Sequence, residues 1–180
     1  MKITKTKFPG LLVLEPKVFE DERGYFFESY RKSIFEQAGI EINILQENES
    51  VSMKNVLRGL HFQIPPFAQD KLVRVAKGSV LDVAMDIRRN SPTYGQWKAF
   101  ELSAENRIQL WIPKGFAHGF KALEDHTIFQ YKCTNIYNRE SEGSIRWNDP
   151  DLNIDWGSGE LILSEKDNEA PLFREFVSPF

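Results

Sequence analysis

The sequence is poor in the residues that build disulfides and metal clusters. Its 180 residues include one cysteine, Cys133, and three histidines, which excludes an internal disulfide and a cysteine-based zinc cluster. No His-x-His pair occurs, and His61 and His118 lie far apart in the sequence, so the ligand spacing of a metal-binding barrel is missing. We therefore expect no metal ion, and we interpret Cys133 as a packed core thiol.

Long apolar runs and a strong excess of one charge are also absent. No run reaches the length of a membrane span, and the N-terminus lacks an apolar signal core, so we expect no membrane contact and a cytoplasmic location. The net charge of −3 and the pI of about 5.7 argue against broad nucleic-acid binding, although one anionic small ligand remains compatible with them. A glycine-rich dinucleotide loop is missing too, which argues against a nicotinamide cofactor.

The periodic segments that are present are short and mostly have a period near two, which is typical of β-strands. Residues 33–38 are the one expected helix, ended by Gly39. Residues 72–76 and 80–87 are predicted to pair as a hairpin. Further strands are predicted at 11–14, 25–30, 97–102, 108–112, 119–123 and 127–134. We therefore expect an all-β sandwich or barrel, with the segment from Asn148 wrapping its outside. Because no linker or repeat occurs, residues 1–180 are expected to form one domain.

Two of the three histidines have unusual surroundings. His61 follows Arg58 in a short apolar stretch, and His118 lies in a turn that leads into a strand, whereas His126 is expected in a solvated turn. A histidine can act as a general base when a carboxylate holds its other ring nitrogen. Three carboxylates are candidates for that role: Asp82 and Asp86, which alternation places on one strand face, and Asp167. The alternative for His61 is a core histidine bonded to the backbone, and the nearby Arg58 favours a functional role.

Cations and tyrosines near predicted strands form a second group of candidates. Lys71 precedes an apolar strand and Arg58 precedes a glycine, positions from which a cation could reach a diphosphate at a barrel mouth. The ordinary explanation for such residues is a solvated face. Tyr131 alternates with apolar residues, as core residues do, whereas Tyr137 follows the strand and could stack on a planar base if exposed.

Eight stretches of the chain resemble the dTDP-4-dehydrorhamnose 3,5-epimerase family, in the family's order and over nearly the whole length. They are DERGYF (21–26), VLRGLHFQ (56–63), KLVRV (71–75), SAEN (103–106), WIPKGFAHGF (111–120), YKCT (131–134), GSIRWNDP (143–150) and ILSEKD (162–167). The resemblance implies a cupin-type jelly-roll β-barrel with a few short peripheral helices. It also implies a homodimer that uses no cofactor.

The resemblance further implies a role for individual residues. His61 corresponds to the base that removes the proton next to the ketone, with Asp167 as its partner, Tyr131 as the acid and Lys71 as the cation at the enolate oxygen. Contacts to the nucleotide sugar are implied for Arg23, Glu28, Gln46, Asn48, Arg58, His118, Tyr137, Glu142 and Lys166. Among these, Tyr137 corresponds to the residue stacked on thymine, and the region of Arg23 and Glu28 is expected to reach across the dimer.

The implied reaction inverts C3 and C5 of dTDP-4-dehydro-6-deoxy-D-glucose, giving dTDP-4-dehydro-L-rhamnose for dTDP-L-rhamnose biosynthesis. The residue types suit this chemistry, because a ketone at C4 acidifies both neighbouring C–H bonds and an ammonium stabilises the resulting enolate. Departures from the family pattern at Glu49, Phe67 and Asp70 leave a 3-epimerase or 5-epimerase of another deoxysugar pathway as the alternative. A metal-dependent cupin and a non-catalytic sugar-nucleotide binding module are the alternatives from other classes.

Overall fold

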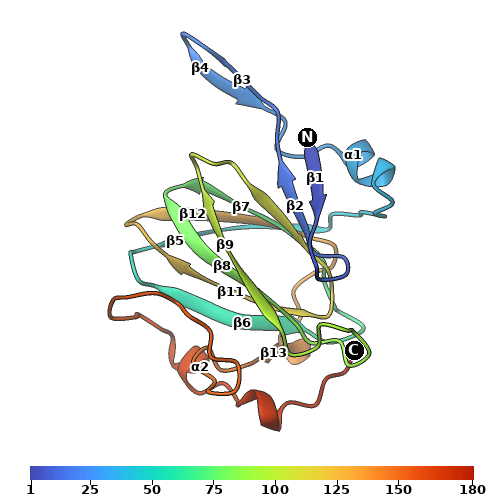
Figure 1. Ribbon diagram of the computed structural model, residues 1–180, viewed down its shortest axis with the longest axis vertical. Coiled ribbons are helices and arrows are strands. Elements are labelled where there is room, and N and C mark those ends of the chain that lie inside the picture. The colour runs from blue at the N-terminus through green and yellow to red at the C-terminus, as the bar shows by residue number, and fades with distance from the viewer.

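The computed structural model describes residues 1–180 and is built almost entirely of short strands (Figure 1). The first strands are β1 (Lys2–Lys5), β2 (Leu12–Glu15), β3 (Val18–Asp21), β4 (Gly24–Phe27), β5 (Gln46–Ser52), β6 (Leu57–Gln63) and β7 (Lys71–Lys77). The remaining strands are β8 (Ser79–Asp86), β9 (Trp97–Ser103), β10 (Gln109–Ile112), β11 (Phe116–Ala122), β12 (Thr127–Cys133) and β13 (Glu142–Ser144). The helical elements are α1 (Lys32–Gln37), α2 (Glu165–Asn168) and two 3₁₀ turns, Arg139–Ser141 and Phe173–Glu175.

Two antiparallel sheets face each other and make up the body of the molecule. One sheet has the strand order β1-β2-β10-β7-β12-β5, and the other has the order β13-β6-β11-β8-β9. Strands β3 and β4 pair only with each other and project from the body as a narrow arm (Figure 1). The prediction of an all-β protein made of short strands with few, short helices is confirmed.

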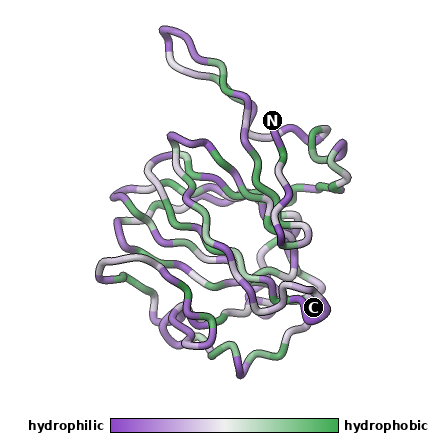
Figure 2. The backbone as a smooth tube through the Cα atoms, in the orientation of Figure 1, coloured by the Kyte–Doolittle hydropathy of each residue, from purple (hydrophilic) through white to green (hydrophobic).

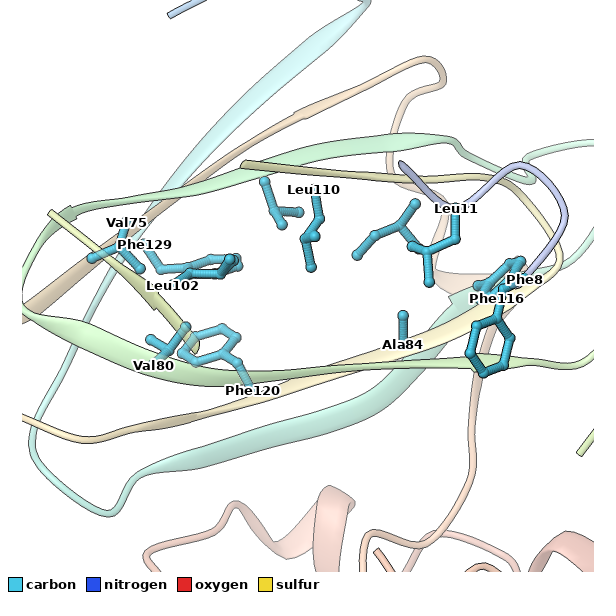
Figure 3. Close-up of a cluster of buried hydrophobic side chains, with 12 residues drawn as sticks. Phe8, Leu11, Val75, Val80, Ala84, Leu102, Leu110, Phe116, Phe120 and Phe129 are labelled. Atoms are coloured by element: carbon cyan, nitrogen blue, oxygen red, sulfur yellow. The ribbon is translucent and has the colours of Figure 1, made fainter. Parts of the chain in front are cut away.

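The core lies between the two sheets. Phe8, Leu110, Phe120 and Phe129 belong to a buried cluster to which both sheets contribute (Figure 3). Strand β8 shows how one strand serves two layers, because side chains alternate between its faces. Val80 and Ala84 point into the cluster between the sheets, and Val83, Met85 and Ile87 belong to a second cluster. The alternation expected for residues 80–87 is therefore confirmed.

The second cluster is covered by the C-terminal part of the chain, as predicted. Leu152, Ile154 and Trp156 pack with Val83 and Met85 of β8. The apolar stretches along the whole chain are short and interrupted by polar residues (Figure 2), which suits strands that bury one face at a time. Neither α1 nor α2 has the length and apolarity that a helical membrane crossing requires.

The predicted helix is also present. It spans Lys32–Gln37, buries Phe35 against Trp111, and ends before Gly39, whose φ of 77° suits the left-handed conformation after a helix.

The predicted hairpin between residues 72–76 and 80–87 is wrong, although both segments are strands. Strand β7 pairs with β10 and β12, whereas β8 pairs with β9 and β11 in the other sheet. The chain crosses between the sheets at Gly78, whose φ is 75°. Val75 and Val80, on either side of the crossing, enter the same core from opposite walls. A tight turn signal cannot distinguish this crossing from a hairpin, because both need a residue with positive φ.

Candidate active site

A cavity of about 470 Å³ opens between the two sheets, a size within the usual range of small-molecule sites. His61 on β6 and His118 on β11 line it from one sheet. Lys71 on β7 and Tyr131 on β12 line it from the other, and Asp167 enters from α2. The structure therefore brings together the four residues to which the sequence assigned catalysis, with His61 and Tyr131 on opposite walls.

His61 is paired with a carboxylate from the C-terminal segment. Its Nε2 lies 2.5 Å from Oδ1 of Asp167, whose side chain is buried. Helix α2 places this carboxylate, and Ser164 caps the helix by accepting a hydrogen bond from the Asp167 amide at 3.1 Å. Burial pushes the pKa of Asp167 upward, but the hydrogen bonds from His61 and Ser164 outweigh it and the net pKa is lowered. Asp167 is thus an ionised partner that holds one ring nitrogen of His61 and leaves Nδ1 without a partner in the chain.

The other two candidate carboxylates serve different partners. Asp86 accepts hydrogen bonds from Arg88, Ser91 and Thr93 and so stabilises the turn after β8. Asp82 bonds His118, with 2.8 Å between Oδ2 and Nε2. The sequence analysis missed this second histidine–carboxylate pair, although it named Asp82 as a candidate partner for a histidine.

Lys71 and Tyr131 are neighbours on adjacent strands. The Lys71 Nζ lies 5.9 Å from the centre of the Tyr131 ring. Burial raises the pKa of the Tyr131 phenol, so the phenol keeps its proton at neutral pH. Burial also lowers the pKa of the Lys71 ammonium, while Cys133, Asp82 and Glu142 act in the opposite direction. Cys133 is a buried thiol directly across from Lys71, as expected for a packed core cysteine.

A chain of polar side chains leads from the cavity to the surface. Lys166 lines the cavity and forms an ion pair of 2.5 Å with Glu142. The Tyr137 hydroxyl donates to the other oxygen of Glu142 at 3.0 Å, and the Tyr137 amide donates to Gln46 at 2.8 Å. Gln46 in turn donates to Asn48 at 2.8 Å. Tyr137 is 53% exposed, so about half of its surface is accessible from outside the chain.

The remaining predicted ligand contacts divide into two groups. Arg58 lines the cavity and donates to Ser52 at 3.2 Å. Arg23 and Glu28 do not line the cavity of their own chain. Arg23 lies on the projecting arm and pairs with Asp21 at 2.5 Å, and Glu28, which follows β4, pairs with Arg31 at 2.6 Å.

Two glycines allow the strands carrying the histidines to approach each other closely. Gly59 on β6 has a φ of 136°, and a Cβ at this position would lie 2.5 Å from the Cα of Gly119 on β11. A Cβ at Gly119 would lie 2.8 Å from the Arg58 carbonyl oxygen. His61 and His118 are direct partners in the same strand pair. Because Gly59 and Gly119 carry no side chain, β6 and β11 can approach closely, and this approach sets the distance between the imidazoles of His61 and His118.

Comparison with known proteins supports the family resemblance over nearly the whole chain. The family model described as dTDP-4-dehydrorhamnose 3,5-epimerase matches residues 5–175. The chain is 57% identical to the dTDP-4-dehydrorhamnose 3,5-epimerase of Salmonella typhimurium over 177 residues, which cover 97% of both chains.

Solved structures agree with this match. A dTDP-6-deoxy-D-glucose-3,5-epimerase from Legionella pneumophila, in complex with dTDP-4-keto-L-rhamnose, is 50% identical with a TM-score of 0.92, covering 96% of this chain and 93% of that chain. ChmJ, a 3′-monoepimerase from Streptomyces bikiniensis in complex with dTDP-quinovose, is 33% identical with a TM-score of 0.90, covering 94% of this chain and 86% of that chain. The predicted cupin-type jelly-roll fold is confirmed by these likenesses together with the two facing sheets.

Proposed function

The chain belongs to the dTDP-4-dehydrorhamnose 3,5-epimerase family and is therefore an epimerase, and from this premise we propose its substrate and mechanism. The substrate is dTDP-4-dehydro-6-deoxy-D-glucose, and inversion at C3 and C5 gives dTDP-4-dehydro-L-rhamnose for dTDP-L-rhamnose biosynthesis. One observation carries the proposal: the His61–Asp167 pair on one wall of the cavity lies opposite Tyr131 and Lys71 on the other.

His61 is the general base. Its Nε2 is held by Asp167, so the lone pair of Nδ1 takes the proton from the carbon next to the ketone. Because the pKa of Asp167 is lowered, this group stays ionised and stabilises the imidazolium that forms. A neutral partner would hold the ring without this electrostatic stabilisation.

Lys71 stabilises the enolate. Removal of the proton moves negative charge to the ketone oxygen, and an ammonium interacts with that charge far more strongly in a cavity than in water. The walls around Lys71 include Phe129 and Leu163, which limit the access of water. Burial also destabilises the Lys71 ammonium before the reaction. The enolate that forms next to it supplies the negative charge that this ammonium lacks.

Tyr131 is the general acid. Burial raises the pKa of its phenol, so the proton is present when the enolate forms. The base and the acid stand on opposite sheets. Proton removal from one face and proton return from the other therefore invert the carbon, and no redox change occurs.

The substrate is held along the polar chain at the cavity mouth. Tyr137 stacks on the thymine ring, and Arg58 and His118 contact the sugar and the diphosphate. The remaining nucleotide-sugar contacts come from Gln46, Asn48, Glu142 and Lys166. The protein is a homodimer, in which Arg23 and Glu28 reach the site of the partner subunit. The projecting arm that carries Arg23 supports this assignment (Figure 1).

Residues 1–180 act as a single domain in the cytoplasm, without a metal, a cofactor, a nucleic-acid partner or a membrane partner. Prolonged dialysis against a chelator tests the metal-free mechanism. Full activity after dialysis is expected, and activity restored only by added metal would contradict it.

Proton NMR of the 4-keto sugar in deuterated water tests the reaction itself. Solvent deuterium should enter at both C3 and C5. Exchange at C3 alone would favour the second candidate, a 3-epimerase, which the likeness to the ChmJ monoepimerase supports. Binding of the dTDP-sugar without any exchange would indicate a non-catalytic binding module.

A further inference from the structure

The mechanism above gives His118 a contact to the substrate but gives no role to its partner Asp82 or to the charge of the pair. Asp82 lies on β8 and is completely buried, and its Oδ2 is 2.8 Å from Nε2 of His118. The other ring nitrogen of His118, Nδ1, makes no hydrogen bond within the chain, and it is not among the buried atoms that lack a partner. Since His118 lines the cavity, Nδ1 is open to a ligand there.

The Asp82 carboxylate has very little other support. Its Oδ1 is buried and receives no hydrogen bond, and no lysine or arginine forms an ion pair with it. An isolated carboxylate without a cation is costly to bury, and the cost falls when a cation is bonded to it. Lys71 interacts with this carboxylate through charge but does not bond it. His118 is the one side chain that bonds it, so a positive His118 ring would supply a charge in direct contact.

The groups around His118 act in both directions. Asp82 on β8 favours a positive ring, whereas Lys71 on β7 and Arg58 on β6 line the same cavity and oppose it. Four further titratable groups line this cavity: His61 on β6, Tyr131 on β12, and Lys166 and Asp167 on α2. The charge of Lys166 opposes a positive ring, and the charge of Asp167, which is bonded to His61, favours one. The Phe129 ring stacks near the imidazole, at 6.0 Å between centres and 25° between planes, an arrangement that favours a cation over an aromatic face.

We propose that Asp82 is a positioning residue that holds His118 as an imidazolium, with its Nδ1–H directed at the substrate oxygen that becomes negatively charged. His118 and Lys71 then act together as two positive donors for the enolate. Asp82 touches no substrate and acts only through His118. The catalytic part of this proposal rests on the proposed function, while the state of the His118–Asp82 pair does not.

Nitrogen-15 NMR of the histidine rings tests the pair directly in the ligand-free protein. The chain has three histidines, so the His61→Asn and His126→Asn variants assign every ring signal. His118 should give the pattern of an imidazolium, with both nitrogens protonated, at pH 7. The exposed His126 serves as an internal reference. A neutral His118 ring at pH 7 would overturn the proposal without any variant of Asp82.

The Asp82→Asn variant tests whether the carboxylate of Asp82 keeps the His118 ring positively charged. The amide keeps the shape of the carboxylate but removes its charge, so His118 should become neutral at pH 7. The matched control is Asp86→Asn, because Asp86 is a buried carboxylate on the same strand that pairs with Arg88. The His118 signals should be unchanged in that control. An imidazolium that persists in folded Asp82→Asn protein would overturn the assignment of Asp82.

Kinetics separate positioning from simple support of the fold. In Asp82→Asn, kcat should fall by about 10²-fold, the usual effect of losing one oxyanion donor. KM should change little, and the alkaline limb of the pH profile should move to lower pH, because His118 then loses its proton more easily. A loss of activity in Asp82→Asn with an unchanged pH profile would contradict the proposal that His118 helps to stabilise the enolate. If the substrate assignment itself fails, the NMR result still decides the state of the pair.

Discussion

His61 and His118 lie directly opposite each other on the antiparallel strands β6 and β11, yet they bind carboxylates from different parts of the chain. His61 pairs with Asp167 of α2, and His118 pairs with Asp82 of β8. Each pair uses Nε2, so both rings leave Nδ1 for the same cavity. One histidine–carboxylate pair can therefore accept the proton while the other stabilises the negative charge.

Replacing the base should strongly reduce proton exchange at both carbons. In His61→Asn, deuterium incorporation at C3 and at C5 should both fall by about 10³-fold, the usual contribution of a general base. The matched control is His126→Asn, since His126 is exposed and its φ of 55° suits asparagine. Exchange at one carbon that survives in His61→Asn would mean that a second base serves that carbon.

Replacing the acid should separate exchange from inversion. Tyr131→Phe keeps the ring that packs beside Phe129, at 6.1 Å between centres, and removes only the hydroxyl. Deuterium should still enter the substrate, because His61 can take and return a proton on its own face. Formation of the inverted sugar should fall by at least about 10²-fold. Normal yields of inverted product would remove Tyr131 from the mechanism.

Lys71 should lower stability while it supports catalysis. Burial lowers the pKa of its ammonium, so the folded protein disfavours the charged form of this side chain. Lys71→Met should abolish turnover and raise the melting temperature by about 2–4 °C, corresponding to about 1 kcal/mol in a protein of this size. The difference from the wild type should shrink as pH rises through the lowered pKa, because the wild-type lysine then becomes neutral. Calorimetry at neutral and alkaline pH measures both effects, and a less stable variant at pH 7 would contradict the argument.

Asp167 should contribute stability that depends on pH in the opposite sense. Its pKa is lowered in the folded protein, so its contribution is complete above the ordinary aspartate value of about 3.9 and is lost as pH falls through the lowered pKa. At pH 7, Asp167→Asn should reduce the free energy of unfolding by about 1.5–3 kcal/mol, as expected for a hydrogen bond to a charged group. Urea titrations should show this gap closing in acid. A gap that stays constant down to the acid transition would show that the charge of Asp167 contributes nothing.

The proposed exchange of the arm can be tested by mixing two inactive variants. Arg23→Ala removes the arm contact, and His61→Asn removes the base. If each site combines its own base with the partner's arm, an equal mixture allowed to exchange subunits should recover roughly a quarter of the wild-type activity. Half of the dimers are then mixed, and each mixed dimer has one complete site. A mixture that stays inactive, with mixed dimers shown by mass spectrometry, would place the Arg23 contact within its own chain.

Strand positions and strand faces could be predicted from the sequence, because side-chain alternation is a local property. Val80 and Val83 fall on opposite faces of β8, as side-chain alternation requires. Pairing between strands could not be predicted equally well. The turn at Gly78 has the same local requirement in a hairpin as in a crossing between sheets, and the choice depends on β10 and β12, which are distant in sequence.

The same limit applies to the site. Family resemblance pointed to Asp167 as the partner of His61, whereas the residues alone left Asp82 and Asp86 equally open. Only the folded chain shows that Asp82 belongs to His118. Pairing of side chains that are 36 or more residues apart depends on sheet order, which the local pattern does not encode.

The contact between Gly59 and Gly119 limits how this protein can be redesigned. Neither residue can be enlarged while the other strand stays in place, since the new carbon would overlap backbone atoms. A library that varies the cavity lining can therefore sample Arg58 or Phe120 more freely than either adjacent glycine. Evolution faces the same restriction, so descendants of this chain should acquire new sugar preferences around the glycine pair rather than through it.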